Sequence, residues 1–271
     1  MKILALQNPF SAPVYHEETV SSTFDIARDL AAKGEAHGTV ICADFQESGR
    51  GRLNRSWKSD RGKNLLFTVL LRCEAFSRND FSSIPEALTL RTGLAVSLAV
   101  EDLVPSLAGF VKVKWPNDVM IGSGKAQAAR KAAGILTEFD GKNVFIGIGV
   151  NVAQTGFPAE YRSRAGSIIH SCPELGEGGI ENIRFVLLEK ILARLYEEIE
   201  TPNKSGPWRE RLVERLYKKG ETVVFAPGAA DSEQLVEGTL SGIGPKGELL
   251  IIPKGEKDER AFVNGELRVY L

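Results

Sequence analysis

Two hydrophobic patterns alternate along residues 1–218. Apolar runs of strand length occur at 38–43, 64–71, 111–115, 134–139 and 143–152. Helical spacing of apolar residues follows Ser22-Thr23 and recurs over 85–104, 183–195 and 208–218. Ser22 and Thr23 stand before Asp25 as a helix start would require, so capping is the simplest role for them. Together the patterns predict a mixed α/β domain.

The pattern changes at Lys219. Short alternating runs at 222–226, 235–241, 248–252, 260–263 and 267–270 are separated by turn clusters rich in glycine and proline. Five short strands in about fifty residues predict a small barrel. We therefore expect a larger domain over 1–218 and a smaller one over 219–271. Within the larger domain, 153–180 is interpreted as a long surface segment.

Positive charge is concentrated between Gly49 and Lys63. These fifteen residues carry six lysines and arginines and one acid, although the net charge of the chain is only −1. A solvated surface loop is the ordinary interpretation of a charge run. Arginines separated by glycine can instead converge on one anion, because the backbone between them is unhindered. The glycines and the buried run that follows favour a mobile loop that handles phosphate.

Composition excludes several classes of protein. With 43% hydrophobic and 25% charged residues, the chain of 271 residues is typical of a globular protein. The balanced charge argues against a general binder of nucleic acid. The sequence contains no signal-peptide core and no apolar run of about 18 residues, the length of a membrane span. The three cysteines and three histidines are widely spaced. We therefore expect reduced thiols, a cytoplasmic location, no membrane partner and no dedicated transition-metal site.

Polar residues and glycines mark several of the predicted strands. Pro116 ends the 111–115 strand and places Asn117 and Asp118 at its end, where sites are often assembled. Gly147 and Gly149 interrupt a buried strand, which indicates either close approach of another backbone or ligand, or a β-bulge. Residues 122–130 are typical of a flexible hairpin tip.

Five ordered motifs resemble those of the biotin protein ligases. The resemblance runs from about Ser22 to the C-terminus, and it implies an α+β fold. In that fold a central mixed β-sheet flanked by helices, similar to class II synthetases, precedes a small SH3-like barrel. The motifs are Ser22-Thr23; Gln46 with Gly49-Arg50-Gly51-Arg52-x-x-Arg55-x-Trp57-x-Ser59; Lys114-Trp115-Pro116-Asn117-Asp118; Lys131-x-x-Gly134-Ile135-Leu136; and Gly147-x-Gly149-x-Asn151.

The resemblance implies a two-step reaction. The family joins biotin to ATP, giving biotinyl-5′-adenylate and pyrophosphate, and passes the biotinyl group to a lysine of an acceptor domain. Biotin and ATP would be the substrates, Mg²⁺ the metal, and a biotin carboxyl carrier protein or another biotin-acceptor domain the partner. Bringing a carboxylate to the α-phosphate gathers negative charge, which cations must offset most strongly in the transition state. A mobile loop suits this chemistry because it can close over the adenylate and exclude water.

The site residues follow from the family correspondence. The expected catalytic residues are Lys131, Arg50, Arg52 and Asp118, and Asp118 would also arrange Mg²⁺ indirectly. The expected substrate-binding residues are Ser22, Thr23, Gln46, Arg50, Gly51, Arg52, Lys131, Gly134, Leu136, Gly147 and Gly149. The expected ATP-binding residues are Arg52, Arg55, Trp57, Lys114, Asn117 and Asn151.

The sequence departs from the family pattern at four places. Phe24 stands where the family usually has Asn, and Asn54 replaces a usual Gly, although Asn tolerates the left-handed conformation. Extra residues follow Asp118 and include Lys125. We assign the catalytic lysine to Lys131, because its spacing to Gly134 matches the family. Arg268 comes earlier than the usual phosphate-facing arginine and is left out of the predicted site.

Other interpretations remain open at this point. A lipoate–protein ligase shares the fold and the adenylate chemistry, although the Gly-Arg-Gly-Arg loop and the Lys114–Asp118 run favour biotin. A non-catalytic biotin sensor is a second alternative, and nucleic-acid binding through the basic loop is a third. Only about twenty residues precede Ser22, so we expect the form without an N-terminal DNA-binding domain. Family precedent alone leaves a homodimer open.

Overall fold

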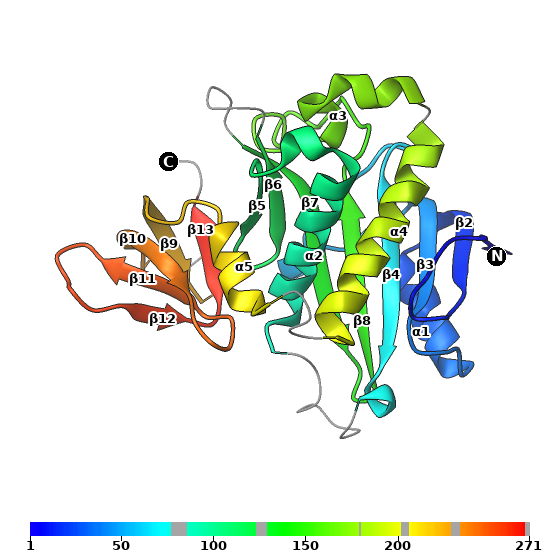
Figure 1. Cartoon of the computed structure of the whole chain (residues 1–271), viewed down its shortest axis with the longest axis horizontal. Helices are drawn as coiled ribbons and strands as arrows, with labels where there is room; N and C mark the ends of the chain where they lie inside the picture. The colour runs from blue at the N-terminus through cyan, green and yellow to red at the C-terminus, as the bar shows by residue number, and fades with distance from the viewer. Residues whose placement is uncertain (77–85, 123–128, 179, 202–205, 229–233, 269–271) are drawn as a thin grey trace.

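The computed structural model describes residues 1–76, 86–122, 129–178, 180–201, 206–228 and 234–268 (Figure 1). Its strands form two separate sheets. The larger sheet has eight strands in the order β1-β2-β3-β4-β8-β7-β6-β5, and only β2 and β3 are parallel. Its strands are β1 Lys2–Ile3, β2 Val14–Val20, β3 Thr39–Gln46, β4 Leu65–Arg72, β5 Val111–Lys114, β6 Asp118–Ile121, β7 Arg130–Phe139 and β8 Asn143–Val150. The predicted central mixed sheet is confirmed.

Strand alternation gives the larger sheet two different faces. In β4, Phe67, Val69 and Leu71 belong to the main hydrophobic core, whereas Leu70 belongs to a smaller core on the other side. This follows from the period of two in a strand, which sends neighbouring side chains to opposite faces. β4 reads as a continuous apolar run because helices cover both of its faces along this length.

The helices divide unequally between the two faces. Helices α2 (Leu88–Leu103) and α4 (Ile180–Ile199) lie side by side across the main core (Figure 1), to which α2 contributes small residues such as Ala95 and Ala99. Helix α1 (Thr23–Ala32) packs on the opposite face, through Phe24, Ala27 and Leu30. It covers only part of that face, and the uncovered remainder lies beside the N-terminus of α1.

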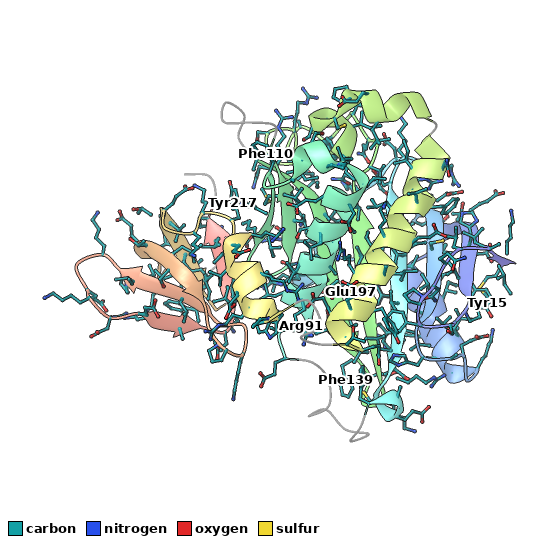
Figure 2. All side chains as sticks on the ribbon, in the orientation of Figure 1. Tyr15, Arg91, Phe110, Phe139, Glu197 and Tyr217 are labelled. Atoms are coloured by element: carbon teal, nitrogen blue, oxygen red, sulfur yellow. The ribbon has the colours of Figure 1, made fainter. Side chains whose placement is uncertain are left out.

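A buried ion cluster connects α2, α4 and helix α5 (Trp208–Glu214). The Arg91 guanidinium donates to the Glu198 carbonyl, and its Nε lies 3.6 Å from the Glu198 carboxylate. Arg211 of α5 reaches the same carboxylate at 2.7 Å. Figure 2 shows Arg91 where the three helices meet. Because Arg91 and Glu198 are both almost fully buried, loss of the Glu198 carboxylate would leave an uncompensated buried charge on Arg91.

The second sheet follows α5 and has five antiparallel strands in the order β12-β11-β10-β9-β13. These are β9 Thr222–Pro227, β10 Val236–Ile243, β11 Leu249–Pro253, β12 Arg260–Phe262 and β13 Gly265–Arg268. They fit the predicted SH3-like barrel. A second hydrophobic core joins Phe225 and Leu249 of this sheet to Leu94 and Trp115. The Trp115 indole also donates to the Gly247 carbonyl at 3.0 Å.

Three expectations about individual elements need adjustment. The helix predicted from Pro85 begins at Leu88 among the described residues, and Pro85 itself lies outside them. The helix predicted over 208–218 ends at Glu214, because the chain then pairs with β5 at Leu216. The segment 153–180 is more than surface: it contains helix α3 (Ile168–Ser171), and Ile168 is fully buried in the main core.

Two further expectations concern the cysteines, predicted to be reduced thiols, and the absence of a membrane span. All three cysteines are free thiols and all are buried. Among the described residues, none of the helices has both the length and the apolar character that a bilayer crossing requires.

Candidate functional site

Two cross-strand rows of residues form the floor of a cavity on the partly covered face of the larger sheet. One row aligns Thr68, Gly147 and Leu136. The next row on the same face aligns Gly149, Gly134, Asp118 and Lys114 across β8, β7, β6 and β5. The cavity encloses about 330 Å³, which is within the usual range for small-molecule sites. The glycines leave its floor without side chains, whereas Asp118 and Lys114 give one side ionic groups.

Aromatic side chains of the same chain cover the floor glycines. A Cβ at Gly147 would lie 2.2 Å from the Phe24 ring, and a Cβ at Gly149 would lie 2.6 Å from the Trp57 indole. Gly134 faces the same indole at 2.9 Å. The strand pairing runs through Gly147 and Gly149 without a register shift, so the β-bulge alternative is wrong. The glycines are required because the aromatic rings of Phe24 and Trp57 approach the strands too closely for a Cβ atom.

One group of residues, which we call the neutral end, lies over β3, β4 and β8. It consists of Thr23, Phe24, Gln46 and Gly147. The Gln46 Oε1 accepts from the Thr23 backbone N–H at 2.8 Å and from the Thr23 hydroxyl at 3.0 Å. No ionised group belongs to this set, and its polar atoms bond mainly to one another.

Ser22 is placed differently from the other predicted binding residues. It is the N-cap of α1, and its fully buried hydroxyl oxygen accepts from the Phe24 backbone N–H at 3.3 Å. It does not line the cavity. The structure thus gives Ser22 the capping role and brings Thr23 to the cavity wall, so that the two adjacent hydroxyls have separate tasks.

A second group, the charged end, lies over β5, β6 and β7. It consists of Arg52, Lys114, Asp118 and Lys131. The Lys131 Nζ lies 2.6 Å from the Asp118 carboxylate, and the Lys114 Nζ lies 3.9 Å from it. Burial lowers the pKa of both Arg52 and Lys114 below their ordinary values, although Asp118 opposes the change in each case. Three cations therefore share one carboxylate at this end.

Asn117 holds part of the charged end in place. Its amide donates to the Ile135 carbonyl at 2.8 Å, which leaves its side-chain oxygen to accept from the Arg52 guanidinium at 3.2 Å. Arg52 comes from the basic loop, whereas Asn117 follows β5. One amide thus connects the loop to the sheet.

The basic loop is folded over the cavity. Trp57 donates its backbone N–H to the Gly49 carbonyl at 2.9 Å, and Gly51 donates to the Arg55 carbonyl at 2.7 Å. At the tip, Leu53 and Asn54 have φ of 55° and 56° in the short 3₁₀ turn Arg52–Asn54. Asn54 therefore occupies the left-handed region that its short polar side chain tolerates. The replacement of glycine by Asn54 is compatible with this tip.

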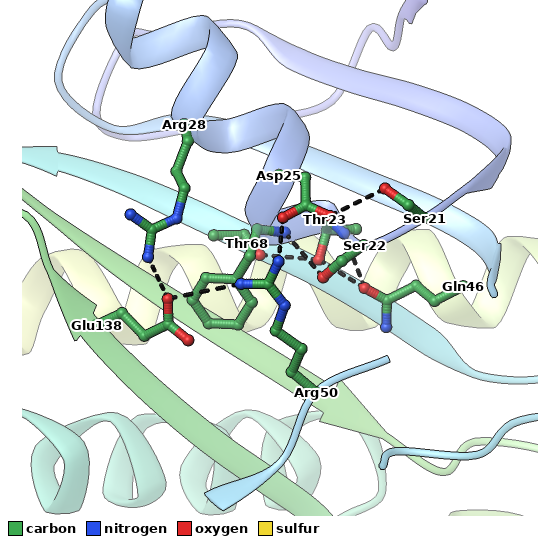
Figure 3. Close-up of polar contacts among 10 residues, drawn as sticks. Ser21, Ser22, Thr23, Asp25, Arg28, Gln46, Arg50, Thr68 and Glu138 are labelled. Carbon is green, nitrogen blue, oxygen red and sulfur yellow. Dashed lines mark hydrogen bonds and ion pairs between the residues drawn. The ribbon is translucent and has the colours of Figure 1, made fainter. Parts of the chain in front are cut away.

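Arg50 points away from the charged end. Its guanidinium pairs with Asp25 in the first turn of α1 and lies 3.9 Å from the Glu138 carboxylate of β7. Glu138 in turn pairs with Arg28. Figure 3 shows Arg50 between the two carboxylates. The loop is thereby connected to both α1 and β7 at the outer edge of the neutral end.

Arg55 connects the loop to the second sheet. Its two terminal nitrogens donate to the two Glu266 carboxylate oxygens at 3.0 and 2.9 Å. The hydrogen bonds from Arg55 lower the pKa of Glu266, and those same bonds raise the pKa of Arg55. This bidentate geometry is the strong form of an arginine–carboxylate pair.

Asn151 presents an unpaired acceptor. Its amide nitrogen donates to the Gly166 carbonyl at 3.0 Å, which fixes the orientation of the side chain. Its buried Oδ1 has no hydrogen-bond partner among the described residues. A ligand donor or an ordered water would complete this buried acceptor.

Every predicted site residue other than Ser22 lines the same cavity, so one site contains segments far apart in the sequence. Lys125 lies outside the described residues. The sequence prediction missed Phe157, Tyr161 and Arg164, which line the cavity from the segment interpreted as surface. It also missed Glu266, and it left out Arg268, which lines the cavity too. The sequence signal for these last two was the run Gly265-Glu266-Leu267-Arg268, which is similar to the C-terminal end of the biotin protein ligases.

Comparison with known proteins identifies the family of the chain. The model of the biotin/lipoate A/B protein ligase family matches residues 17–151. Biotin–(acetyl-CoA-carboxylase) ligase of Mycobacterium tuberculosis is 30% identical over 237 residues, covering 86% of this chain and 80% of that protein. The chain belongs to the biotin/lipoate A/B protein ligase family. The predicted resemblance to the biotin protein ligases is therefore confirmed.

Other members of the biotin/lipoate A/B protein ligase family agree over different lengths. The structure of biotin protein ligase from Aquifex aeolicus in complex with biotin and ATP has a TM-score of 0.70 at 26% identity. That match covers 94% of this chain and 97% of that one. The bifunctional ligase/repressor BirA of Bacillus subtilis is 34% identical over 169 residues, which are 59% of this chain and 47% of that protein. The alignment thus spans about half the length of that relative.

Proposed function

We propose that this chain is an ATP-dependent biotin–protein ligase. One observation carries the proposal: a single cavity joins a neutral hydrogen-bonding end to an end where three cations share one carboxylate. Biotin has the matching form, since an uncharged bicyclic ring stands at one end of its chain and a carboxylate at the other. The biotin–(acetyl-CoA-carboxylase) ligase of Mycobacterium tuberculosis and the Aquifex enzyme with bound biotin and ATP support the same activity.

The charged end would carry the first step. An oxygen of the biotin carboxylate attacks the α-phosphorus of ATP, the bond from that phosphorus to the β-phosphate bridging oxygen breaks, and pyrophosphate leaves. Lys131, Lys114 and Arg52 offset the negative charge that gathers there. Asp118 holds the Lys131 ammonium by their 2.6 Å contact, so the cation needs little reorganisation when charge develops.

The second step uses an amine of the acceptor. The ε-amine of an acceptor lysine attacks the acyl carbon of biotinyl-5′-adenylate, the bond from that carbon to the phosphate oxygen breaks, and AMP leaves. The indole of Trp57, a residue of the loop, covers the floor glycines. While the loop stays folded, this ring would exclude water from the acyl carbon. The acceptor would be a biotin carboxyl carrier domain; the Mycobacterium tuberculosis relative is named as a ligase for acetyl-CoA carboxylase.

Asn151 would recognise the nucleotide. Its unpaired buried Oδ1 matches the exocyclic amine of adenine, a donor that would complete it. Arg55 is less suited to the departing phosphates than its sequence position suggests. Its guanidinium is occupied by both Glu266 oxygens, and a phosphate would have to displace them.

Magnesium fits this site as part of the ATP substrate. The described residues contain no group of three or more His, Cys, Asp or Glu side chains that could hold a metal ion. Asp118 is paired with Lys131, and Glu266 with Arg55, so neither carboxylate is a free ligand. Mg²⁺ would therefore enter on the phosphate oxygens of ATP and not on the Asp118 carboxylate.

The domain organisation and location complete the proposal. We propose a catalytic domain over 1–218 and an SH3-like domain over 219–271, which share the core around Trp115 and Phe225. Three buried free thiols suit a reducing compartment, so we propose the cytoplasm. That the protein has no nucleic-acid partner stays a prediction. Whether it forms a homodimer stays open.

One experiment tests the function. The protein is incubated with ATP, Mg²⁺ and an apo biotin-acceptor domain, with either biotin or lipoate, and the acceptor is weighed by intact mass spectrometry. We expect one biotinyl group on the acceptor, dependent on ATP, and no lipoyl group. Transfer of lipoate alone would replace the proposal with a lipoate ligase. Absence of any ATP-dependent acylation would overturn it.

A further inference from the structure

A chain of hydrogen bonds begins behind the neutral end, at Thr68 in the centre of β4. The fully buried Thr68 hydroxyl donates to the Thr23 Oγ1 at 2.8 Å. The Thr23 hydroxyl then donates to the Gln46 Oε1 at 3.0 Å (Figure 3). Each hydroxyl has one hydrogen, so the direction of this relay is fixed once its first donor is fixed.

The far end of the relay determines which atom of Gln46 faces the cavity. The Thr23 backbone N–H can only donate, and it lies 2.8 Å from the Gln46 Oε1. A flipped amide would bring its NH₂ group against that N–H, which places two donors together. The Gln46 Oε1 is therefore occupied by two donors from Thr23. Among the described residues, no acceptor is hydrogen-bonded to the Gln46 Nε2.

Thr68 secures this arrangement through Thr23. When Thr68 donates to Thr23 Oγ1, the Thr23 hydrogen is directed to Gln46 and cannot rotate to a competing acceptor. Gly49 lies beside this amide: a Cβ there would lie 2.4 Å from the Trp57 carbonyl oxygen and 3.3 Å from the Gln46 Nε2, so glycine leaves room at the amide nitrogen. The amide is thus held at its oxygen and clear at its nitrogen.

We propose that Thr68 is a positioning residue for substrate selection, acting through Thr23 to hold the Gln46 Nε2 as a fixed donor toward the acyl substrate. This inference rests on the proposed function, and it names the feature of biotin that is selected. The cyclic urea of biotin carries a carbonyl oxygen that can accept from Nε2. The dithiolane ring of lipoate carries no comparable acceptor, so it would leave the donor unpaired.

The test uses biotin-dependent exchange between ATP and labelled pyrophosphate. Thr68→Val removes the hydroxyl and keeps the shape, and Thr68→Ser keeps the hydroxyl. Thr39→Val is the matched control, because Thr39 is equally buried and its hydroxyl has no partner among the described residues. We expect Thr68→Val to raise the KM for biotin about tenfold, the effect of one lost buried hydrogen bond. The kcat and the KM for ATP should stay within about twofold, and Thr68→Ser and Thr39→Val should match the wild type within the same margin.

A double-mutant cycle distinguishes positioning from a general effect on folding. In a Gln46→Met background, Thr68→Val should change the KM for biotin by less than about twofold, because the amide that it positions is gone. Thr68→Ala serves if Thr68→Val does not fold. An active wild-type enzyme with equal effects of Thr68→Val and Thr39→Val, or with a tenfold effect that persists in the Gln46→Met background, would overturn the relay alone. A wild-type enzyme without biotin-dependent exchange would overturn the proposed function itself.

Discussion

The neutral end and the charged end are built by opposite means. At the neutral end, the Gln46 oxygen is occupied by two donors from Thr23, and Phe24 packs onto Gly147. At the charged end, Lys114, Lys131 and Arg52 surround the single carboxylate of Asp118, so positive charge is in excess. The neutral end carries no charge to balance and leaves one amide donor, the Gln46 Nε2, for a ligand, whereas the charged end requires an anion to balance it.

The two ends would therefore contribute to substrate binding in different ways. A satisfied hydrogen-bond network in a packed wall selects a substrate by shape and by one remaining donor. An excess of buried cations is unfavourable in the empty site, as the lowered pKa values of Arg52 and Lys114 indicate. Under the proposed function, the carboxylate and phosphates of the substrates would offset that cost, and the cations would then stabilise the further negative charge that gathers in the transition state.

The largest expected effect comes from removing a cation at the charged end. Lys131→Ala should lower the adenylation rate by roughly 10²–10³, by analogy with the loss of one charge-stabilising donor. Stopped-flow or pyrophosphate-exchange assays measure this rate. Lys142→Ala, an exposed lysine in the turn after β7, is the control and should leave the rate unchanged. A larger effect from Lys125→Ala would mean that the catalytic lysine is assigned incorrectly.

The next effect tests whether the neutral end is as rigid as its packing indicates. Gly147→Ala places a methyl group 2.2 Å from the buried Phe24 ring, and it should lower the free energy of unfolding by about 1–3 kcal/mol. Gly149→Ala meets the Trp57 indole, which belongs to the loop and can move, so its cost should be smaller. Gly156→Ala, with nothing within 4 Å of the new methyl group, is the control.

Urea unfolding with a circular dichroism signal ranks the three glycine variants. The expected order of destabilisation is Gly147→Ala, then Gly149→Ala, then Gly156→Ala. If Gly149→Ala proves as costly as Gly147→Ala, the loop is as rigid as the core and the contrast between the two ends fails.

A smaller effect concerns the connection between the loop and α1. Asp25→Asn removes the charge that holds Arg50, and trypsin should then cleave the loop about two- to fivefold faster in the ligand-free protein. The range follows from the modest free energy of a partly exposed ion pair. Asp29→Asn, on an exposed position of the same helix, should not change the cleavage rate. Equal rates for all three proteins would show that Arg50 does not restrain the loop.

The smallest effect depends on pH. The folded-state pKa of Glu266 is lowered by Arg55, so the pair stabilises the protein above the ordinary glutamate pKa of about 4.3. That stability is lost as the pH falls through the lowered folded value. Glu266→Gln should therefore cost up to about 1 kcal/mol at pH 7 and nearly nothing at the acid end. Urea titrations at several pH values measure the difference, with Glu259→Gln, at an exposed position near β12, as the control. A difference that is independent of pH would contradict this origin.

Local patterns in the sequence predicted much of the fold. The apolar runs at 134–139 and 143–152 correspond to β7 and β8, and the helical spacing over 183–195 lies in α4. These elements depend on periodicity within one segment, which a sequence displays directly. Where they end was less predictable, as at Glu214, since long-range pairing decides it.

The site was predictable to the extent that its residues belong to recognisable motifs. Gly147 and Gly149 indicated close approach, but the identity of the approaching groups, Phe24 and Trp57, depends on tertiary contacts. Glu266 was missed because its partner Arg55 lies 211 residues away. Tyr161 was missed because its segment shows no period. Such contacts exist only once the chain is folded.

Trp57 gives the loop an optical signal of its own. Its indole lies against Gly134 and Gly149, and the Lys131 ammonium is 5.5 Å from the ring centroid. The other two tryptophans, Trp115 and Trp208, belong to the core shared with the second sheet. A protein in which both of those are replaced by phenylalanine would fluoresce from the loop alone. Its emission would then follow loop opening, and the arrival of an anion beside Lys131, in real time.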